Sequence, residues 1–138
     1  MSIMQEIHFE SGLLNVHARG EFSLEEGKRA FLEMLGAVAQ YKAKTVLIDA
    51  REVKGKPELV ERFYYGEFAA NKTRRLVLEH GIVPRFAYII TAALQHPARL
   101  GELVATNRGM SVKTFETPEE ACEWLKLTPA KKPDAADA

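Results

Sequence analysis

Residues 106–125 read TNRGMSVKTFETPEEACEWL, an order that predicts the end of one helix, a short strand and a second helix. Gly109 stands where a glycine commonly ends a helix, because glycine takes the left-handed backbone conformation at little cost. The four residues Val112–Phe115 follow as the strand. Thr117 forms a capping box with Glu120, and Pro118 occupies the first helical position. The last helix is expected to bury Ala121, Trp124 and Leu125.

The N-terminal residues predict a β-hairpin. Two short runs, Glu6–Glu10 and Leu13–Arg19, flank the two-residue turn Ser11-Gly12. In this register one face of the hairpin is apolar and the other is polar, so we expect only one face to be covered. The apolar face would carry Ile7, Phe9, Leu14, Val16 and Ala18, and the polar face Glu6, His8, Glu10, Asn15, His17 and Arg19.

The middle of the chain alternates between helical and strand periods. Strands that alternate with helices predict an α/β domain with a mainly parallel sheet and right-handed crossovers. In order, the expected elements are a helix capped by Ser23 and Glu26 that runs to about Gln40, a strand Thr45–Asp49, a helix from Pro57 to Gly81, a strand Phe86–Thr91 and a helix from Pro97 to Gly109.

Three segments resemble the SpoIIAA-like proteins, which are relatives of the STAS regulatory domains. They are residues 47–51 (LIDAR), residues 61–67 (ERFYYGE) and the block from Asn107-Arg108-Gly109 to Trp124-Leu125. The resemblance covers roughly residues 5–127. It implies a mixed, mostly parallel sheet with an antiparallel N-terminal hairpin and helices on both faces. We therefore expect a single domain over residues 1–127, followed by a disordered tail over 128–138, where no periodic apolar pattern remains.

The chain departs from this family at one position that matters for function. Partner-switching STAS proteins carry a phosphorylatable serine in the turn after the strand that corresponds to residues 45–49. Here the turn reads Val53-Lys54-Gly55-Lys56-Pro57, and the four serines of the chain (Ser2, Ser11, Ser23 and Ser111) lie elsewhere in the sequence. A lysine neither accepts phosphate from a serine kinase nor mimics the charge of a phosphoserine. We therefore expect no phosphoserine switch.

Composition excludes several classes of protein. The 19 basic and 19 acidic residues cancel, so nucleic-acid binding is not expected. No apolar run approaches the roughly 20 residues of a membrane-spanning helix, and the N-terminus lacks a secretion pattern. The single cysteine, Cys122, suits a reducing compartment. We expect a cytoplasmic protein without a cofactor.

The carboxyl ends of the expected parallel strands are a candidate ligand site, since ligands of open α/β sheets bind in the crevice beyond those ends. Asp49, Arg51, Lys54 and Gly55 follow one strand, and Thr91 and Gln95 follow the next. Such a cluster could hold a small anion. The alternative is a surface ion pair between Asp49 and Arg51 with solvated lysines.

The helix from Glu58 to Glu79 predicts an association surface. Its expected core stripe is Leu59, Phe63, Gly66, Ala70 and Val77. Phe68 then points away from the core, and Tyr64 and Tyr65 flank it. Exposed rings on a helix commonly mark an interface, so we expect a homodimer formed through Tyr64, Tyr65 and Phe68.

No reactive constellation emerges from the sequence. His8, His17 and Glu6 share a hairpin face, but diagonal neighbours on strands lie roughly 7–8 Å apart, which suits a metal poorly. Cys122 lies in an amphipathic helix without a nearby base. We therefore expect a bacterial-type, non-catalytic regulatory or interaction module that binds a protein partner or a small anion. A carrier of lipid or another apolar molecule, like the CRAL-TRIO domains, is the alternative, and an enzyme is disfavoured.

Overall fold

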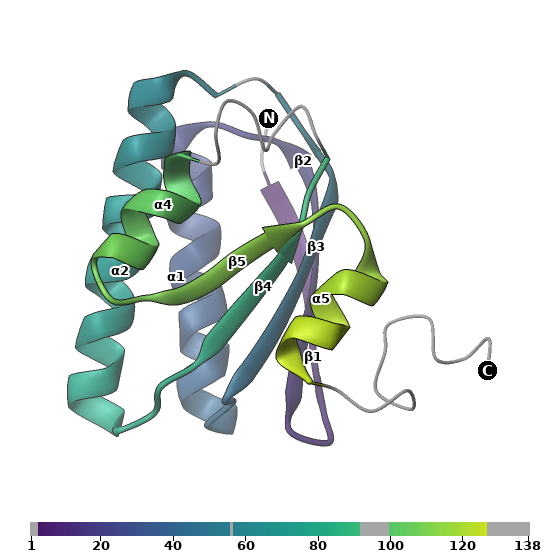
Figure 1. Ribbon diagram of the computed structural model, residues 1–138, viewed down its shortest axis with the longest axis vertical. Coiled ribbons are helices and arrows are strands. Elements are labelled where there is room, and N and C mark those ends of the chain that lie inside the picture. Colours follow the sequence, from purple (N-terminus) through teal and green to yellow (C-terminus); the bar gives the residue numbers. More distant parts are fainter. Residues whose placement is uncertain (1–2, 56, 92–99, 127–138) are drawn as a thin grey trace.

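The computed structural model describes residues 3–55, 57–91 and 100–126. These residues form a five-stranded sheet whose spatial order, β1-β2-β3-β4-β5, repeats the order in the chain. Only the first pair, β1 and β2, is antiparallel, and every later neighbour is parallel (Figure 1). The strands are β1 (Ile3–Glu10), β2 (Leu13–Glu21), β3 (Thr45–Lys54), β4 (Arg85–Ile89) and β5 (Ser111–Phe115).

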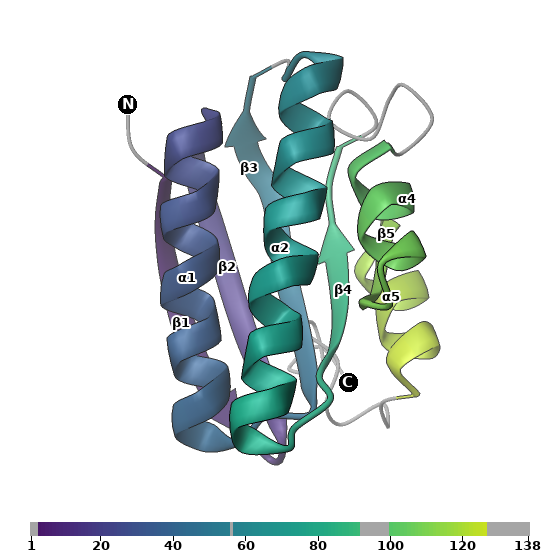
Figure 2. The ribbon, with the colours of Figure 1, turned by 90° about the vertical axis from the view of Figure 1, so that its left-hand side faces the viewer.

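The helices cover the two faces of the sheet unequally. Three of them, α1 (Leu24–Tyr41), α2 (Leu59–His80) and α4 (Leu100–Asn107), lie on one face, as Figures 1 and 2 show. Each connects neighbouring parallel strands that step in the same direction, and right-handed crossovers of that kind place their helices on one side. The last helix, α5 (Pro118–Leu125), packs on the opposite face against β3, β4 and β5. The predicted mixed sheet with helices on both faces is confirmed.

The N-terminal hairpin has the predicted register. Glu10 pairs with Leu13, Phe9 with Leu14 and Ile7 with Val16. Both turn residues have positive φ, 54° at Ser11 and 84° at Gly12, which the tight turn of a two-residue hairpin loop requires.

The core has two parts, one on each side of the sheet. The larger part joins the sheet to α1, α2 and α4, and Phe31, Val46 and Phe86 are among its most buried members. The smaller part lies under α5. Its members are Leu13, Leu47, Ala87, Ile89, Ala121, Cys122 and Leu125. Trp124, which the sequence predicts to be buried, is only partly covered, with the guanidinium of Arg85 4.1 Å above its ring.

The helix ends follow the capping signals in the sequence. The hydroxyls of Ser23 and Thr117 accept hydrogen bonds from the backbone amides of Glu26 and Glu120. The helix α2 ends at Gly81, whose φ is 71°. The predicted start of α4 at Pro97 and the predicted tail after residue 127 lie outside the described residues.

Two predictions about the central elements are wrong. The strand β3 does not end near Asp49 but continues to Lys54, with a register shift opposite His17 and Arg19. The helix α2 buries Arg62, Gly66, Ala69, Ala70, Thr73 and Leu76 instead of the predicted stripe, which shares only Gly66 and Ala70 with this set. Leu59, which was expected in the core, is 55% exposed. In the described part of the chain, no helix is long and apolar enough to cross a membrane.

Candidate functional site

Asp49 and Arg51 form a salt bridge on the α5 face of the sheet. The Nε of Arg51 donates to Oδ1 of Asp49 at 2.9 Å, and its Nη2 donates to Oδ2 at 2.6 Å. Burial raises the pKa of Asp49, but the hydrogen bonds from Arg51 outweigh it and the net pKa is lowered. The same contact raises the pKa of Arg51. The charge and hydrogen-bonding groups of Asp49 are thus paired with those of Arg51, which is the ion pair predicted from the sequence as the alternative to an anion site.

The other residues proposed for an anion site lie farther along the strands. Lys54 is the last residue of β3, three residues beyond Arg51. Gly55 has a φ of 123° and packs against Phe22, so it serves the turn. Thr91 follows β4 and is exposed, and Gln95 lies outside the described residues. The structure therefore shows a direct contact between Asp49 and Arg51, and the anion site stays a prediction.

Two of the three aromatic residues proposed for an interface are turned toward the protein interior. The ring of Tyr65 packs edge-on against Phe22 and Phe31, and its hydroxyl lies 3.1 Å from that of Tyr88. Phe68 is partly buried against the larger core, with the Lys28 ammonium 5.2 Å from its ring. The premise that Phe68 points away from the core is therefore wrong. Tyr64 is 47% exposed and stays a candidate.

The exposed face of α2 carries apolar residues that the sequence prediction did not include. Besides Tyr64, Val60 is 51% and Leu78 is 79% exposed. With Glu67, Asn71 and Arg74, these residues are spaced by four, three, four, three and four positions along the helix. That spacing is the heptad pattern of a helix seam. We call Val60, Tyr64, Glu67, Asn71, Arg74 and Leu78 the α2 seam.

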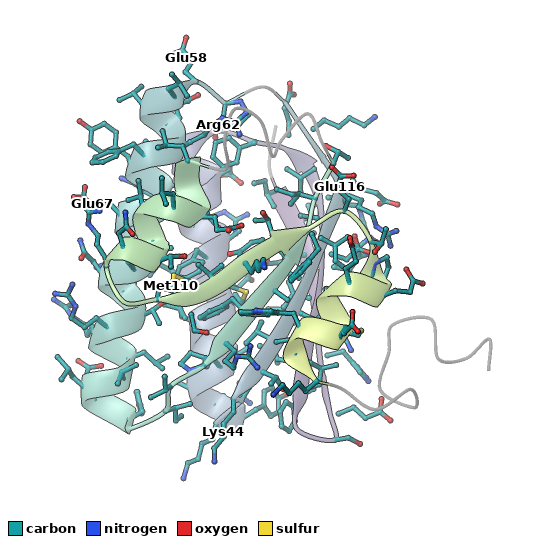
Figure 3. All side chains as sticks on the ribbon, in the orientation of Figure 1. Lys44, Glu58, Arg62, Glu67, Met110 and Glu116 are labelled. Carbon is teal, nitrogen blue, oxygen red and sulfur yellow. The ribbon has the colours of Figure 1, made fainter. Side chains whose placement is uncertain are left out.

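A partly open cavity of about 180 Å³ lies between the helix layer and the sheet. Its walls are almost entirely apolar, and the hydroxyls of Tyr65 and Tyr88 meet within its lining. Figure 3 labels two lining residues, Arg62 on α2 and Met110 just before β5. The sequence prediction missed this cavity, although the small residues Gly66 and Ala69, which line it from α2, were a signal for it.

The described residues contain no group of three His, Cys, Asp or Glu side chains that could hold a metal. His17 lies 3.9 Å from Glu6 and 3.6 Å from Glu52, and His8 lies 3.9 Å from Glu10, all on exposed side chains. Cys122 is fully buried in α5.

No protein-family model matches the sequence, and no curated protein sequence matches it significantly. Solved structures do match. The structure of an anti-sigma factor antagonist from Mycobacterium paratuberculosis has a TM-score of 0.60 and 20% sequence identity, and the match covers 91% of this chain and 95% of that one. The chain has the SpoIIAA-like fold.

A second structure with the SpoIIAA-like fold is an uncharacterised protein of the DUF3478 family from Shewanella loihica PV-4. It is 23% identical, with a TM-score of 0.43, over 90% of this chain and 94% of its own. The match to the anti-sigma factor antagonist establishes the fold, which agrees with the predicted STAS-related architecture.

Proposed function

We propose that this SpoIIAA-like chain is a non-catalytic interaction module and that the α2 seam is its binding surface. The observation that carries the proposal is the exposure of the apolar seam residues Val60, Tyr64 and Leu78, which lie toward the two ends of the seam. An exposed apolar surface commonly marks a protein contact. The occupant that the seam fits best is a second copy of the chain, aligned antiparallel.

The seam is symmetric about its own midpoint. Position 69 lies halfway between Val60 and Leu78, between Tyr64 and Arg74, and between Glu67 and Asn71. If two copies cross there on a two-fold axis, Val60 meets the partner's Leu78 and Tyr64 meets the partner's Arg74. The first pair is apolar, and the second places a guanidinium over an aromatic ring. A two-fold interface forms each contact twice.

The charges that flank the seam also favour the antiparallel arrangement. The N-cap Glu58 and the residues Glu61 and Glu67 make the start of α2 acidic, although the buried Arg62 lies among them and Arg108 of the same chain lies 3.4 Å from Glu67. The second half carries Lys72, Arg74 and Arg75 against one acid, Glu79. Antiparallel copies place the acidic half of each helix beside the basic half of the other, whereas parallel copies would oppose like charges.

Similarity to an anti-sigma factor antagonist supports a protein-binding role, since that protein is named for acting on another protein. We propose that this chain acts without a phosphoserine switch, because Lys54, the last residue of β3, and Gly55, which follows it, stand where a serine would be needed. We also propose a cytoplasmic location, which suits the buried thiol of Cys122.

The alternative ligands receive less support. The fork of Arg51 is occupied by Asp49, which disfavours an anion there. The cavity, at about 180 Å³, is smaller than the roughly 300–1,000 Å³ pockets that hold drug-sized ligands, so a long lipid chain would not fit inside it.

The test compares a seam variant with a matched control by analytical ultracentrifugation at micromolar concentration. The seam variant is Tyr64→Ser with Leu78→Ser. The control is Met4→Ser with Leu32→Ser, since these residues are 59% and 47% exposed but lie on β1 and α1. We expect the wild type and the control to sediment as dimers and the seam variant as a monomer. A monomeric wild type, or a seam variant that stays dimeric, would contradict the proposal.

A further inference from the structure

The cavity between the helix layer and the sheet is lined by small residues where large ones would close it. Gly27 and Ala30 line it from α1, Ala69 from α2, and Ala18 and Ala50 from the sheet. Close packing is the rule in protein interiors, and voids larger than a water molecule are few. An apolar space of this size, open to the surface, is therefore a feature to explain.

The helix layer is held in place by a backbone contact beside the cavity. A Cβ on Gly66 of α2 would lie 2.4 Å from the carbonyl oxygen of Gly101 on α4, so the two helices approach as closely as backbones can. The phenol ring of Tyr65 spans the gap between α2 and the sheet, where it meets Tyr88. The first contact fixes α2 against α4 within the helix layer, and the second holds α2 away from the sheet beside the alanine-lined space.

Tyr65 and Tyr88, which both line this apolar space, bring two hydroxyls together. The hydroxyls of Tyr65 and Tyr88 share one hydrogen bond of 3.1 Å, in which either can donate. Each hydroxyl has one proton, so their mutual bond uses one donor and leaves the other available. Burial raises the pKa of both phenols, so both are neutral at physiological pH.

The charged side chains in the lining are engaged with the protein itself. Nε of Arg62 donates to the carbonyl oxygen of Pro57 at 3.1 Å. Oε1 of Glu102 accepts from the backbone amide of Thr114 at 2.8 Å and from its hydroxyl at 2.6 Å. A ligand in the cavity therefore meets apolar walls and neutral hydroxyls, which select against a charged head.

From this geometry we propose that the cavity is a binding site for a neutral molecule about the size of one aromatic ring that carries a single hydroxyl or carbonyl group. An engineered cavity of about 150 Å³ in another protein binds benzene, so the size matches. The apolar body of the ligand fills the space beside Ile48 and Met34. Its oxygen accepts the spare proton of the tyrosine pair.

The probe is p-cresol, compared with toluene, which has the same ring and methyl group but no hydroxyl. Binding is followed by methyl NMR of the full-length protein. We expect p-cresol to shift the methyl signals of Ile48, Met34 and Ala69, which line the cavity. The signals of Leu13, Leu47 and Leu125, buried on the opposite face of the sheet, should not move.

The role of the hydroxyls is tested with the double variant Tyr65→Phe, Tyr88→Phe, which removes both partners of one hydrogen bond and keeps both rings. The wild type should bind p-cresol about five-fold more tightly than toluene, the size of effect expected for one neutral hydrogen bond. In the double variant the two probes should bind alike. The control is Tyr41→Phe, which removes an exposed hydroxyl on α1 and should keep the five-fold preference.

Three results would overturn the inference. They are the absence of shifts at millimolar p-cresol, equal shifts on both faces of the sheet, and a preference for p-cresol that survives in the double variant.

Discussion

At the scale of single residues, Gly66 shows how much depends on one missing methyl group. It is the position where α2 touches α4, and a Cβ there would lie 2.4 Å from the Gly101 carbonyl oxygen. The backbone cannot give way without moving a whole helix. The absence of a side chain therefore sets the distance between two elements that also border the cavity.

We predict that Gly66→Ala destabilises the protein by about 1–3 kcal/mol, the usual cost of forcing extra atoms into a packed contact. The matched control is Gly36→Ala. Gly36 lies in α1 with no atom within 4 Å of an added Cβ, so alanine there should stabilise the helix by about 0.5–1 kcal/mol. Urea unfolding of the three proteins gives both values. If Gly66→Ala leaves the free energy of unfolding unchanged, or changes it by the same amount as Gly36→Ala, the α2–α4 contact is not tight.

At the scale of elements, helix side chains hydrogen-bond to one residue on each edge strand of the sheet. On β1, the backbone amide of Ile3 donates to Glu26 at 3.0 Å and its carbonyl oxygen accepts from Arg29. On β5, the amide of Thr114 donates to Glu102 of α4. Unpaired strand edges otherwise invite pairing with another chain. At these two positions the backbone groups of the edge are therefore already paired.

We predict that Glu102→Ala destabilises the protein by about 1–3 kcal/mol, since it leaves the Thr114 amide without its charged acceptor. Thr114→Val removes only the hydroxyl contact and should cost less. Thermal unfolding ranks the two variants, and light scattering should show more aggregation for Glu102→Ala because the β5 edge is then open. A larger cost for Thr114→Val would contradict this view of the edge.

The elements that the sequence predicted correctly carry their signal locally. The hairpin register follows from Ser11-Gly12, and the helix starts follow from Ser23 and Thr117, because turns and caps are made by neighbouring residues. The prediction of which face of α2 is buried failed, because that face is decided by tertiary contacts. Hydrophobic periodicity favoured the large residues Leu59 and Phe63, whereas the structure buries Ala69 and Thr73 in their place.

The candidate sites were predictable only in part, for a related reason. Asp49 and Arg51 are two residues apart on one strand, so the sequence alone indicated that they could form an ion pair instead of an anion site. Tyr65 on α2 and Tyr88 on β4 are 23 positions apart in the sequence, and nothing local to either residue indicates that they meet. Tyr65 and Phe68 were placed on the surface because the phase of α2 was wrong.

At the scale of the whole molecule, the two faces of the sheet are covered unequally. Three helices cover one face, and α5 covers the β3–β5 half of the other (Figure 1). The hairpin half of that second face carries the polar residues Glu6, His8 and His17. No described helix covers it, in line with the expectation that only one face of the hairpin is covered. The α5 helix is thus the sole cover of the smaller core among the described elements.

We predict that a variant ending after residue 127 keeps the stability of the full chain, because the sequence pattern places the end of the domain there. A variant ending after residue 116 loses α5 and exposes Leu13, Leu47 and Ile89. It should be largely unfolded or aggregated. Circular dichroism with thermal melting distinguishes the two, and a large loss of stability in the longer variant would show that residues 128–138 belong to the fold.

The agreement between strand order in space and strand order in the chain bears on how the protein is made. As a nascent chain leaves the ribosome, each new strand can join the free side of the last one, and none has to be inserted between strands already paired. Folding can therefore keep pace with synthesis, from the N-terminus onward. At each stage the unpaired edge belongs to the strand synthesised last. Glu102 of α4, which accepts a hydrogen bond from the Thr114 amide of β5, is synthesised just before that strand.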